Sequence, residues 1–177
     1  MINNKKFVAI IVAREGSSRL PGKHSKLVMN RTILSLIIER TKSLTNCDEI
    51  CLATTNKKED NALVEIAKTE QISWFRGDED DVLKRIYDAA IYCNADYIIE
   101  IGGDCPFVDR SVVDKGVDLL VKNESDFVCN FYPASYPDGI DLSLMTRKCL
   151  EKLNKCANLK SQRMHPFPFI FNNLDIF

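Results

Sequence analysis

The stretch FVAIIVAREGSSRLPGK, residues 7–23, decides the fold of this chain. Its first six residues are apolar and mostly β-branched, which is typical of a buried strand. Residues 14–23 then contain two glycines, two serines, two arginines and a lysine. Glycines let backbone N–H groups turn toward an anion, and the cations neutralise it. Because a strand that leads into such a loop usually marks a phosphate site in an α/β sheet, the stretch predicts binding of a nucleoside triphosphate.

Two well-known phosphate loops do not fit this stretch. A P-loop that starts at Gly16 would need glycine where Pro21 stands, and Ser or Thr where His24 follows the lysine. The dinucleotide fingerprint fails as well, because Gly16 and Gly22 stand too far apart. An ordinary polar surface loop is the remaining alternative. The crowding of charges, glycines and a proline directly behind a core strand disfavours it.

The rest of the chain alternates between strand and helix patterns. Apolar runs predict strands at 49–54, 72–75, 97–101 and 127–130, and apolar side chains at helical spacing predict helices at 34–44, 58–70, 82–93 and 112–120. This alternation predicts an α/β fold with a doubly wound, mostly parallel sheet and helices on both faces. No repeat, linker or low-complexity tract interrupts it, so residues 1–177 are expected to form a single domain.

Composition narrows the class of protein. The chain has 177 residues, of which 45% are hydrophobic and 28% charged, with a formal net charge of -1. That balance argues against a nucleic-acid-binding role, which would need a basic face. No apolar stretch is long enough for a membrane span, and the N-terminal residues do not resemble a signal peptide. We therefore expect a cytoplasmic enzyme that contacts neither membrane nor nucleic acid.

The seven cysteines are scattered and form no CxxC pair. Cys47 and Cys51 are separated by three residues but have no second pair and no nearby histidine, so a zinc site is not expected. Reduced and mostly buried thiols are the expected state.

Several motifs together resemble one family. The run ARxGSSRLPGK at 13–23 closely resembles the N-terminal motif of the cytidylyltransferase family of the spore coat polysaccharide biosynthesis protein F type, which is related to the CMP-sialic acid and CMP-KDO synthetases. Further segments match in the expected order, namely ATTNKKED at 53–60, FRGDEDDVLKR at 75–85, IGGDCPFVD at 101–109 and YPDGIDL at 136–142. The resemblance implies a nucleotide-diphospho-sugar transferase-like fold. It also implies transfer of CMP from CTP to a sugar acid, with release of pyrophosphate, for surface polysaccharide or glycan biosynthesis.

The phosphate loop supplies the predicted catalytic residues. Arg14, Arg19 and Lys23 are expected to stabilise charge on the phosphates. The backbone N–H groups of 16–18 are expected to lie near the phosphate oxygens. Residues 53–55 and the phosphate loop are candidates for the cytosine by resemblance only. The full set of predicted nucleotide-binding residues is Ala13, Gly16, Ser17, Ser18, Gly22, Thr54, Thr55 and Arg85.

Two acidic segments are candidates for the metal. Asp104 follows the predicted strand 97–101, so it should face the same crevice as the phosphate loop. Mg²⁺ binds through one or two carboxylates plus substrate phosphates, and Asp104 is the predicted ligand, with a turn or helix-capping role as the alternative. Asp109 is the better candidate for the helix cap. Asp141 is either a second metal ligand or an acceptor contact, and Asp138 is either an acceptor contact or part of an Asp-Gly turn.

Asp78-Glu79-Asp80-Asp81 contains a D-x-D, the metal motif of many sugar-nucleotide glycosyltransferases. A glycosyltransferase is therefore the second enzyme hypothesis. Because this segment begins a predicted helix, capping is the expected role of Asp80 and Asp81.

The C-terminal region departs from the family pattern. Relatives usually read Ser-x-Arg-Glu-His-Val-Thr, whereas here Arg163 is followed by Met164, His165 and two prolines. Arg163 and His165 are the predicted acceptor-binding residues, although prolines should bar a regular helix there. The chain is shortened relative to the family pattern, so the apolar run 167–171 is expected to be exposed or paired with a second subunit in a homodimer. A truncated nucleotide-binding module without turnover is the third hypothesis. His24, next to the phosphate loop, is expected to be solvated, with a phosphate contact as the alternative.

Overall fold

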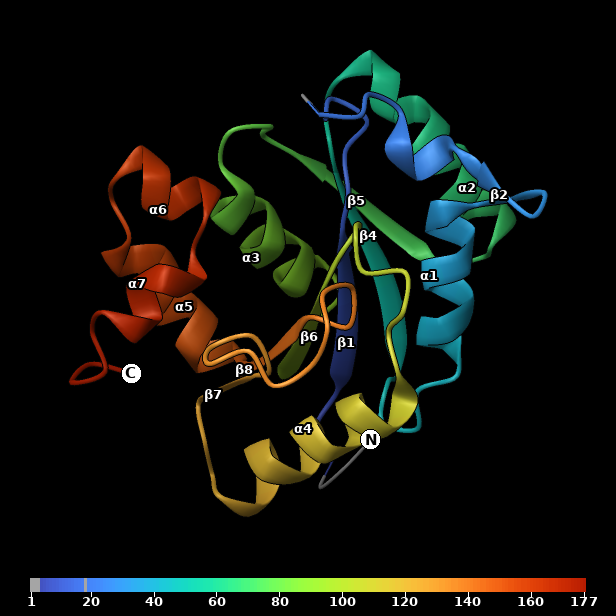
Figure 1. Cartoon of the computed structure of the whole chain (residues 1–177). Helices are drawn as coiled ribbons and strands as arrows, with labels where there is room; N and C mark the ends of the chain where they lie inside the picture. The colour runs from blue at the N-terminus through green and yellow to red at the C-terminus, as the bar shows by residue number, and fades with distance from the viewer. Residues whose placement is uncertain (1–3, 18) are drawn as a thin grey trace.

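The computed structural model describes residues 4–17 and 19–177, and its centre is a twisted six-stranded sheet (Figure 1). The strands follow the order β5-β4-β1-β6-β8-β7. The four strands from β5 to β6 are parallel, and β8 runs antiparallel to both of its neighbours. The strands are β1 (Phe7–Val12), β4 (Glu49–Thr55), β5 (Ser73–Gly77), β6 (Tyr97–Gly102), β7 (Phe127–Cys129) and β8 (Leu142–Thr146).

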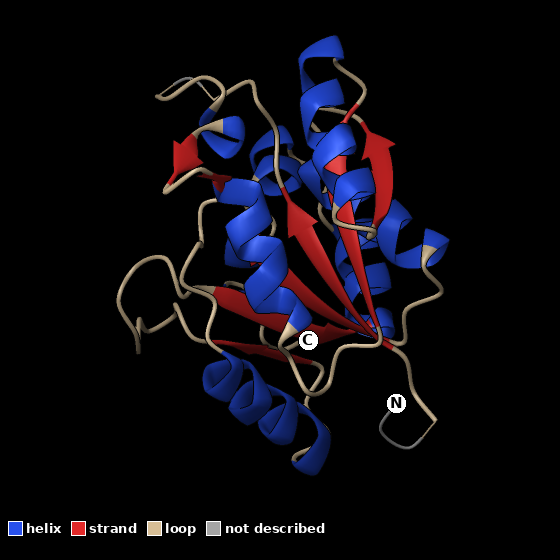
Figure 2. Cartoon of the chain, turned by 90° about the vertical axis from the view of Figure 1, so that its right-hand side faces the viewer, coloured by secondary structure: helices blue, strands red, loops and turns tan. Residues whose placement is uncertain are grey.

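Helices cover both faces of this sheet (Figure 2). The helices are α1 (Ile33–Lys42), α2 (Asn61–Thr69), α3 (Val82–Tyr92), α4 (Arg110–Lys122), α5 (Arg147–Cys156), α6 (Lys160–Met164) and α7 (Phe167–Phe171). Short 3₁₀ turns lie at η1 (Lys23–Ser25) and η2 (Lys58–Asp60), and a small hairpin joins β2 (Leu27–Val28) to β3 (Arg31–Thr32). The predicted doubly wound, mostly parallel sheet is confirmed.

The central strand β1 contributes to both hydrophobic cores. Ala9 and Ile11 point to the core that α1, α2 and α4 cover, whereas Val8 and Ile10 point to the core under α3 and α5. Successive side chains of a strand face opposite sides, so a strand buried on both faces must be apolar throughout. This is why the run before the phosphate loop is continuous rather than alternating.

Side-chain caps define where the longer helices begin. The Asp109 carboxylate accepts hydrogen bonds from the N–H groups of Ser111 and Val112 at the start of α4, which confirms the predicted cap. Thr146 caps α5 in the same way through the N–H of Cys149. Each such cap satisfies donors that have no partner within the helix.

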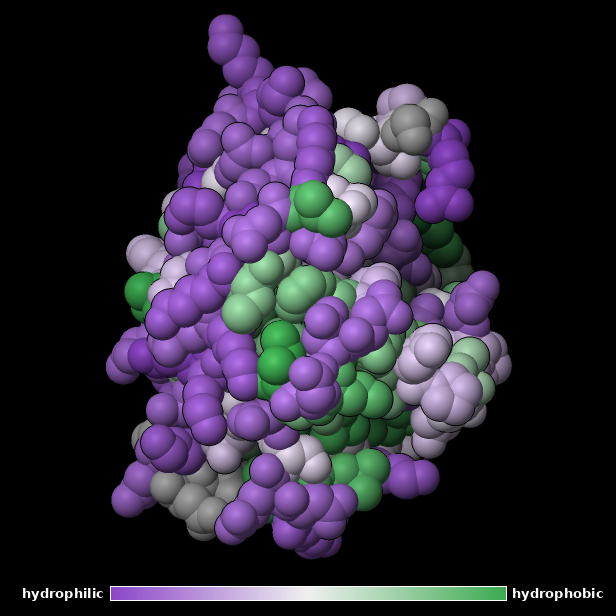
Figure 3. Space-filling view, turned by 90° about the vertical axis from the view of Figure 1, so that its left-hand side faces the viewer, coloured by the Kyte–Doolittle hydropathy of each residue, from purple (hydrophilic) through white to green (hydrophobic). Residues whose placement is uncertain are grey.

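The C-terminal segment corrects two expectations. Pro166 and Pro168 do not bar a helix, because they occupy the cap and first turn of α7, where an N–H has no helical partner. The run 167–171 is not left exposed either, since Ile170 is buried in the second core and Phe167 packs near Phe127 with ring centroids 5.8 Å apart. The face that carries α5 to α7 nevertheless shows a patch of apolar side chains between polar ones (Figure 3). In the described part of the chain, no helix has the length and apolar character needed to span a membrane.

Candidate active site

The candidate site lies where β1 and β6 end side by side. Val12 pairs with Gly102 in the parallel register, and the N–H of Gly103 donates to the carbonyl of Val12 at 2.9 Å. A Cβ atom on Gly103 would lie 2.6 Å from Nε2 of His24 and 2.9 Å from the Val12 carbonyl. Only glycine permits this close approach, and it brings Asp104 over the phosphate loop.

A cavity of about 400 Å³ opens between these two loops. Predicted site residues make up much of its lining: Ala13, Arg14, Ser17, Arg19, Lys23, Arg85, Asp104 and His165. The structure therefore brings together all three predicted catalytic cations and the predicted metal ligand. Of the other loop residues, Ser18 lies outside the described residues, and Gly16 and Gly22 shape the loop without lining the cavity.

Lys23 and Asp104 form an ion pair across this cavity. Lys23 Nζ lies 3.1 Å from Oδ2 of Asp104, whose side chain remains 61% exposed. Burial alone would raise the pKa of Asp104, but the hydrogen bond and charge of Lys23 outweigh it and hold this pKa below its usual value. The carboxylate is thus ionised and open to solvent, with the Lys23 ammonium as its partner.

Arg14 also has an acidic neighbour, which the sequence did not suggest. Arg14 Nη1 lies 3.1 Å from Oε1 of Glu79, and Lys57 Nζ lies 3.3 Å from the other oxygen of the same carboxylate. A Cβ atom on Gly16 would come within 3.1 Å of Glu79. Glu79 therefore holds the Arg14 guanidinium at the loop. An anionic ligand in the cavity would compete with Glu79 for this guanidinium.

The buried Asp60 carboxylate and a backbone carbonyl fix the conformation of the phosphate loop. Asp60 accepts from the N–H of Glu15 at 2.7 Å and from the N–H of Thr55 at 3.0 Å, so it ties the loop to the end of β4. The carbonyl of Glu15 accepts from Ser17 and Gly22, which closes the loop on itself. In the sequence Asp60 reads only as an acidic residue in a helical first turn, so this positioning role was missed.

Arg85 is a buried part of the cavity wall. Its guanidinium donates to the carbonyl of Asp78 at 2.7 Å, while Nε has no partner among the described residues. Burial, with a contribution from the charge of Arg14, lowers the pKa of Arg85. Thr54 and Thr55, predicted to bind nucleotide, are buried behind the loop and do not line the cavity; the Thr55 hydroxyl donates to Asp60.

Of the predicted acceptor residues, only His165 lies at the cavity. His165 is exposed at the cavity, whereas Arg163 turns away and makes a two-point pair with Asp81, each N···O distance being 2.9 Å. Asp138 and Asp141 lie in the segment before β8 and do not line the cavity. The N–H of Gly139, whose φ of 92° needs glycine, approaches the Asp141 carboxylate at 3.5 Å.

His24 corrects the expectation that it is solvated. Its side chain is only 3% exposed, and Nδ1 has no partner within the described structure. Burial, and then the charge of Lys23, lower the pKa of His24 to about 4. The imidazole is therefore neutral, and it lines the cavity next to Gly103.

A family model described as cytidylyltransferase matches residues 8–177. The chain belongs to the cytidylyltransferase family. A solved cytidylyltransferase from Leptospira borgpetersenii is 35% identical, with a TM-score of 0.93, over 98% of this chain and 74% of that one. An uncharacterized protein of Methanocaldococcus jannaschii is 40% identical over 97% of this chain and 70% of its own length.

More distant cytidylyltransferase relatives carry names with a substrate or pathway. The spore coat polysaccharide biosynthesis protein SpsF of Bacillus subtilis is 28% identical, and the match covers 86% of this chain and 64% of SpsF. A 3-deoxy-manno-octulosonate cytidylyltransferase of Solibacter usitatus is 30% identical over 66% of this chain, which spans 46% of that relative. A CMP:2-keto-3-deoxy-manno-octonic acid synthetase complexed with CTP shares the fold, with 17% identity and a TM-score of 0.73 over 97% of this chain and 87% of that one.

In this cytidylyltransferase the D-x-D segment does not line the cavity, and its carboxylates make local contacts instead. The Asp78 carboxylate accepts from the N–H groups of Asp80 and Asp81, and Asp81 caps α3 through the N–H of Lys84. Capping is thus confirmed for Asp81. It is wrong for Asp80, which forms an ion pair with Lys160 at 2.9 Å instead.

The donor set beside the cytidylyltransferase cavity fits magnesium better than a transition metal. Among residues 4–17 and 19–177, no group of three or more His, Cys, Asp or Glu side chains converges. Asp104 alone offers an open, ionised carboxylate at the cavity. Mg²⁺ binds through one or two carboxylates when substrate phosphates complete its coordination, so the residues present fit this ion.

Proposed function

We propose that the chain transfers CMP from CTP to a hydroxyl of a sugar acid and releases pyrophosphate, in the biosynthesis of a surface polysaccharide or another glycan. The observation that carries the proposal is the cavity at the ends of β1 and β6, where Arg14, Arg19 and Lys23 face Asp104. The names of the relatives support the nucleotide and the acceptor class. Because the chain spans 46% to 70% of these curated relatives, its activity and substrates are proposed rather than carried over.

In the proposed reaction the triphosphate of CTP lies along the loop 14–23. Its phosphates replace Asp104 and Glu79 as the partners of Lys23 and Arg14. An oxygen of the acceptor hydroxyl attacks the α-phosphorus in line, the bond to the bridging oxygen breaks, and pyrophosphate leaves as that oxygen takes the electron pair. The hydroxyl proton passes to solvent. Such transfers need positioning and charge neutralisation more than covalent help.

Asp104 would hold the magnesium ion. Asp141, which does not line the cavity, stays a prediction as a second ligand or an acceptor contact. When bound, Mg²⁺ supplies neutralising charge between the phosphates. The ammonium of Lys23 is released from Asp104 at the same time and becomes free to bind a phosphate oxygen. Asp104 would thus pair with Lys23 when no metal is bound and hold Mg²⁺ when the metal is present.

The test is calorimetric titration with each of the four ribonucleoside triphosphates, with and without magnesium. We expect selective binding of CTP that magnesium strengthens, and loss of that strengthening in Asp104→Asn. Asp118→Asn, an exposed aspartate on α4, is the matched control and should behave as the wild type. Equal binding of all four nucleotides, or no binding, would overturn the proposal. Binding of CTP without pyrophosphate release from a panel of sugar acids would favour the binding module.

A glycosyltransferase receives no support from the geometry, because neither Asp78 nor Asp80 lines the cavity at the ends of β1 and β6, whereas Asp104 does. Asp78→Asn should accordingly leave the effect of magnesium on CTP binding unchanged.

A further inference from the structure

A second cavity, of about 560 Å³, adjoins the cavity between the phosphate loop and Asp104, which we call the nucleotide cavity. It lies between α3, β6, residues 131–132 and the C-terminal segment 164–172. Val82, Met164 and His165 line both cavities, so a molecule in one can meet a molecule in the other at this boundary. An acceptor role for the second cavity rests on the proposed function, since the adjoining cavity must then hold a nucleotide.

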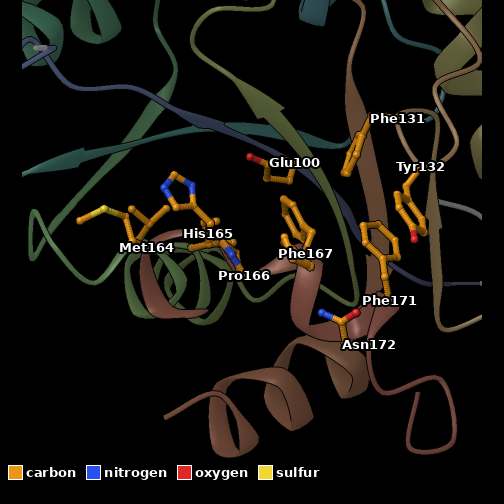
Figure 4. Close-up of a pocket in the computed structure, with 12 residues that line it drawn as sticks. Glu100, Phe131, Tyr132, Met164, His165, Pro166, Phe167, Phe171 and Asn172 are labelled. Carbon is orange, nitrogen blue, oxygen red and sulfur yellow. The ribbon is translucent and has the colours of Figure 1, made fainter. Parts of the chain in front are cut away.

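Aromatic rings form one wall of the second cavity (Figure 4). The ring centroids of Phe131 and Phe167 are 5.9 Å apart, and those of Phe131 and Phe171 are 6.1 Å apart. Tyr132 stacks on Phe171 with a centroid distance of 4.2 Å. Small-molecule sites typically combine such apolar walls with a few placed polar groups that set orientation.

Glu100 is the one carboxylate among the lining residues, and none of them is a lysine or an arginine. Its Oε2 accepts a hydrogen bond from the buried Ser143 hydroxyl at 3.2 Å. No hydrogen bond among the described residues reaches Oε1. In Figure 4 the Glu100 side chain lies between His165 on one side and the rings of Phe167 and Phe131 on the other.

The surroundings of Glu100 disfavour a second negative charge. Burial raises the pKa of Glu100 to about 7; the Ser143 hydrogen bond opposes this shift, and the charge of Asp104 adds to it. A carboxyl group with a pKa of about 7 forms hydrogen bonds readily with a hydroxyl or an amino group. A ligand anion at the same place would lie in an apolar cavity without a cation, which is costly.

The two cavities together set the orientation of an acceptor. Its attacking hydroxyl must reach the α-phosphate, and therefore lies at the boundary near His165. The carboxylate of a sugar acid, when it is bonded to the same carbon as that hydroxyl, then reaches the first cavity, where it shares the cations Arg14, Arg19 and Lys23 with the phosphates of CTP. The far end of the sugar then lies in the second cavity, which we call the aromatic cavity after its wall of rings.

We propose that Glu100 is a specificity-determining residue of the acceptor site, which hydrogen-bonds a hydroxyl or amino group at the far end of the sugar. The apolar face of the sugar lies against Phe131 and Phe167. The acceptors that fit are sugar acids whose only anionic group is next to the attacking hydroxyl. A phosphate or second carboxylate at the far end is rejected.

Binding without turnover tests this assignment directly. The probes are 3-deoxy-manno-octulosonate, its 8-phosphate and N-acetylneuraminate, titrated by calorimetry into the CTP-loaded protein with magnesium chelated. At least one unphosphorylated probe should bind to the wild type, and Glu100→Gln, which keeps the shape of the side chain, should weaken that binding about tenfold. The 8-phosphate should bind at least about tenfold more weakly than its parent sugar in the wild type, and Glu100→Gln should narrow that gap.

The controls separate this inference from the proposed function. Glu65→Gln, an exposed glutamate on α2, should leave all affinities unchanged. In Glu100→Gln, an unchanged dissociation constant for CTP shows that the variant is folded. Equal sugar affinities in wild type and Glu100→Gln, or no binding of any probe, would overturn the role of Glu100. Failure of the proposed function would show separately, as absent CTP binding or absent pyrophosphate release when magnesium is restored.

Discussion

The two cavities on either side of His165 are built in different ways. The nucleotide cavity takes Arg14, Ser17, Arg19 and Lys23 from one contiguous loop. The aromatic cavity takes its wall from four separate parts of the chain, α3, β6, 131–132 and 164–172. The comparison teaches that a charged site made by one loop is visible in the sequence. A cavity assembled from distant apolar residues reads there as ordinary core.

The largest expected effect removes the lysine that faces Asp104. Lys23→Ala should lower the rate of pyrophosphate release by about 10²–10³-fold, because a preorganised donor for the charge that develops on the phosphates is lost. Steady-state pyrophosphate release at saturating CTP is the measurement. Lys26→Ala, an exposed lysine three residues further on, is the matched control and should retain wild-type turnover. Retained turnover in Lys23→Ala would show that Lys23 of the nucleotide cavity is not a catalytic residue.

A second prediction concerns His24, the buried histidine that lines the nucleotide cavity. His24 has a pKa of about 4 in the folded protein and near 6.5 when unfolded. Below pH 6.5 His24 binds a proton in the unfolded chain, whereas in the folded protein it stays neutral until the pH nears 4. Stability is therefore complete above pH 6.5 and falls as the pH approaches 4, by up to about 3 kcal/mol.

Urea unfolding between pH 4 and 7 checks this prediction, by comparison of wild type with His24→Gln. The variant should show a flatter dependence of unfolding free energy on pH. His165→Gln, which replaces the exposed histidine, should keep the steeper dependence of the wild type. Parallel curves for wild type and His24→Gln would contradict the buried neutral state.

The smallest expected effect sharpens the other side of the comparison. Phe167→Leu removes ring contacts with Phe127 and Phe131 but keeps an apolar side chain, so we expect a loss of about 1 kcal/mol in unfolding free energy. CTP affinity should not change, because Phe167 lines only the aromatic cavity of the two. Urea unfolding and CTP titration are the measurements, with the exposed Phe107→Leu as control. A matching loss of CTP affinity would show that the two cavities act as one.

Prediction from sequence succeeded where local pattern was enough. The strand 7–12, the helix cap at Asp109 and the meeting of Arg14, Lys23 and Asp104 follow from short patterns and from the rule that parallel strands end at one edge. It failed at the C-terminal segment, where prolines suggested a break but lie in the first turn of α7. It also misassigned His24 and Asp80, because exposure and ion pairing depend on residues far away in the chain.

The sequence by itself determined the α/β alternation, the phosphate loop and the family, because periodicity and contiguous motifs carry that information. Only the tertiary structure decided that Asp60 ties the loop to β4, that His24 is buried and neutral, and that Glu100 faces an aromatic cavity. The physical reason is common to all three. Burial and hydrogen-bond partners are set by segments that meet only when the sheet and its helices have packed.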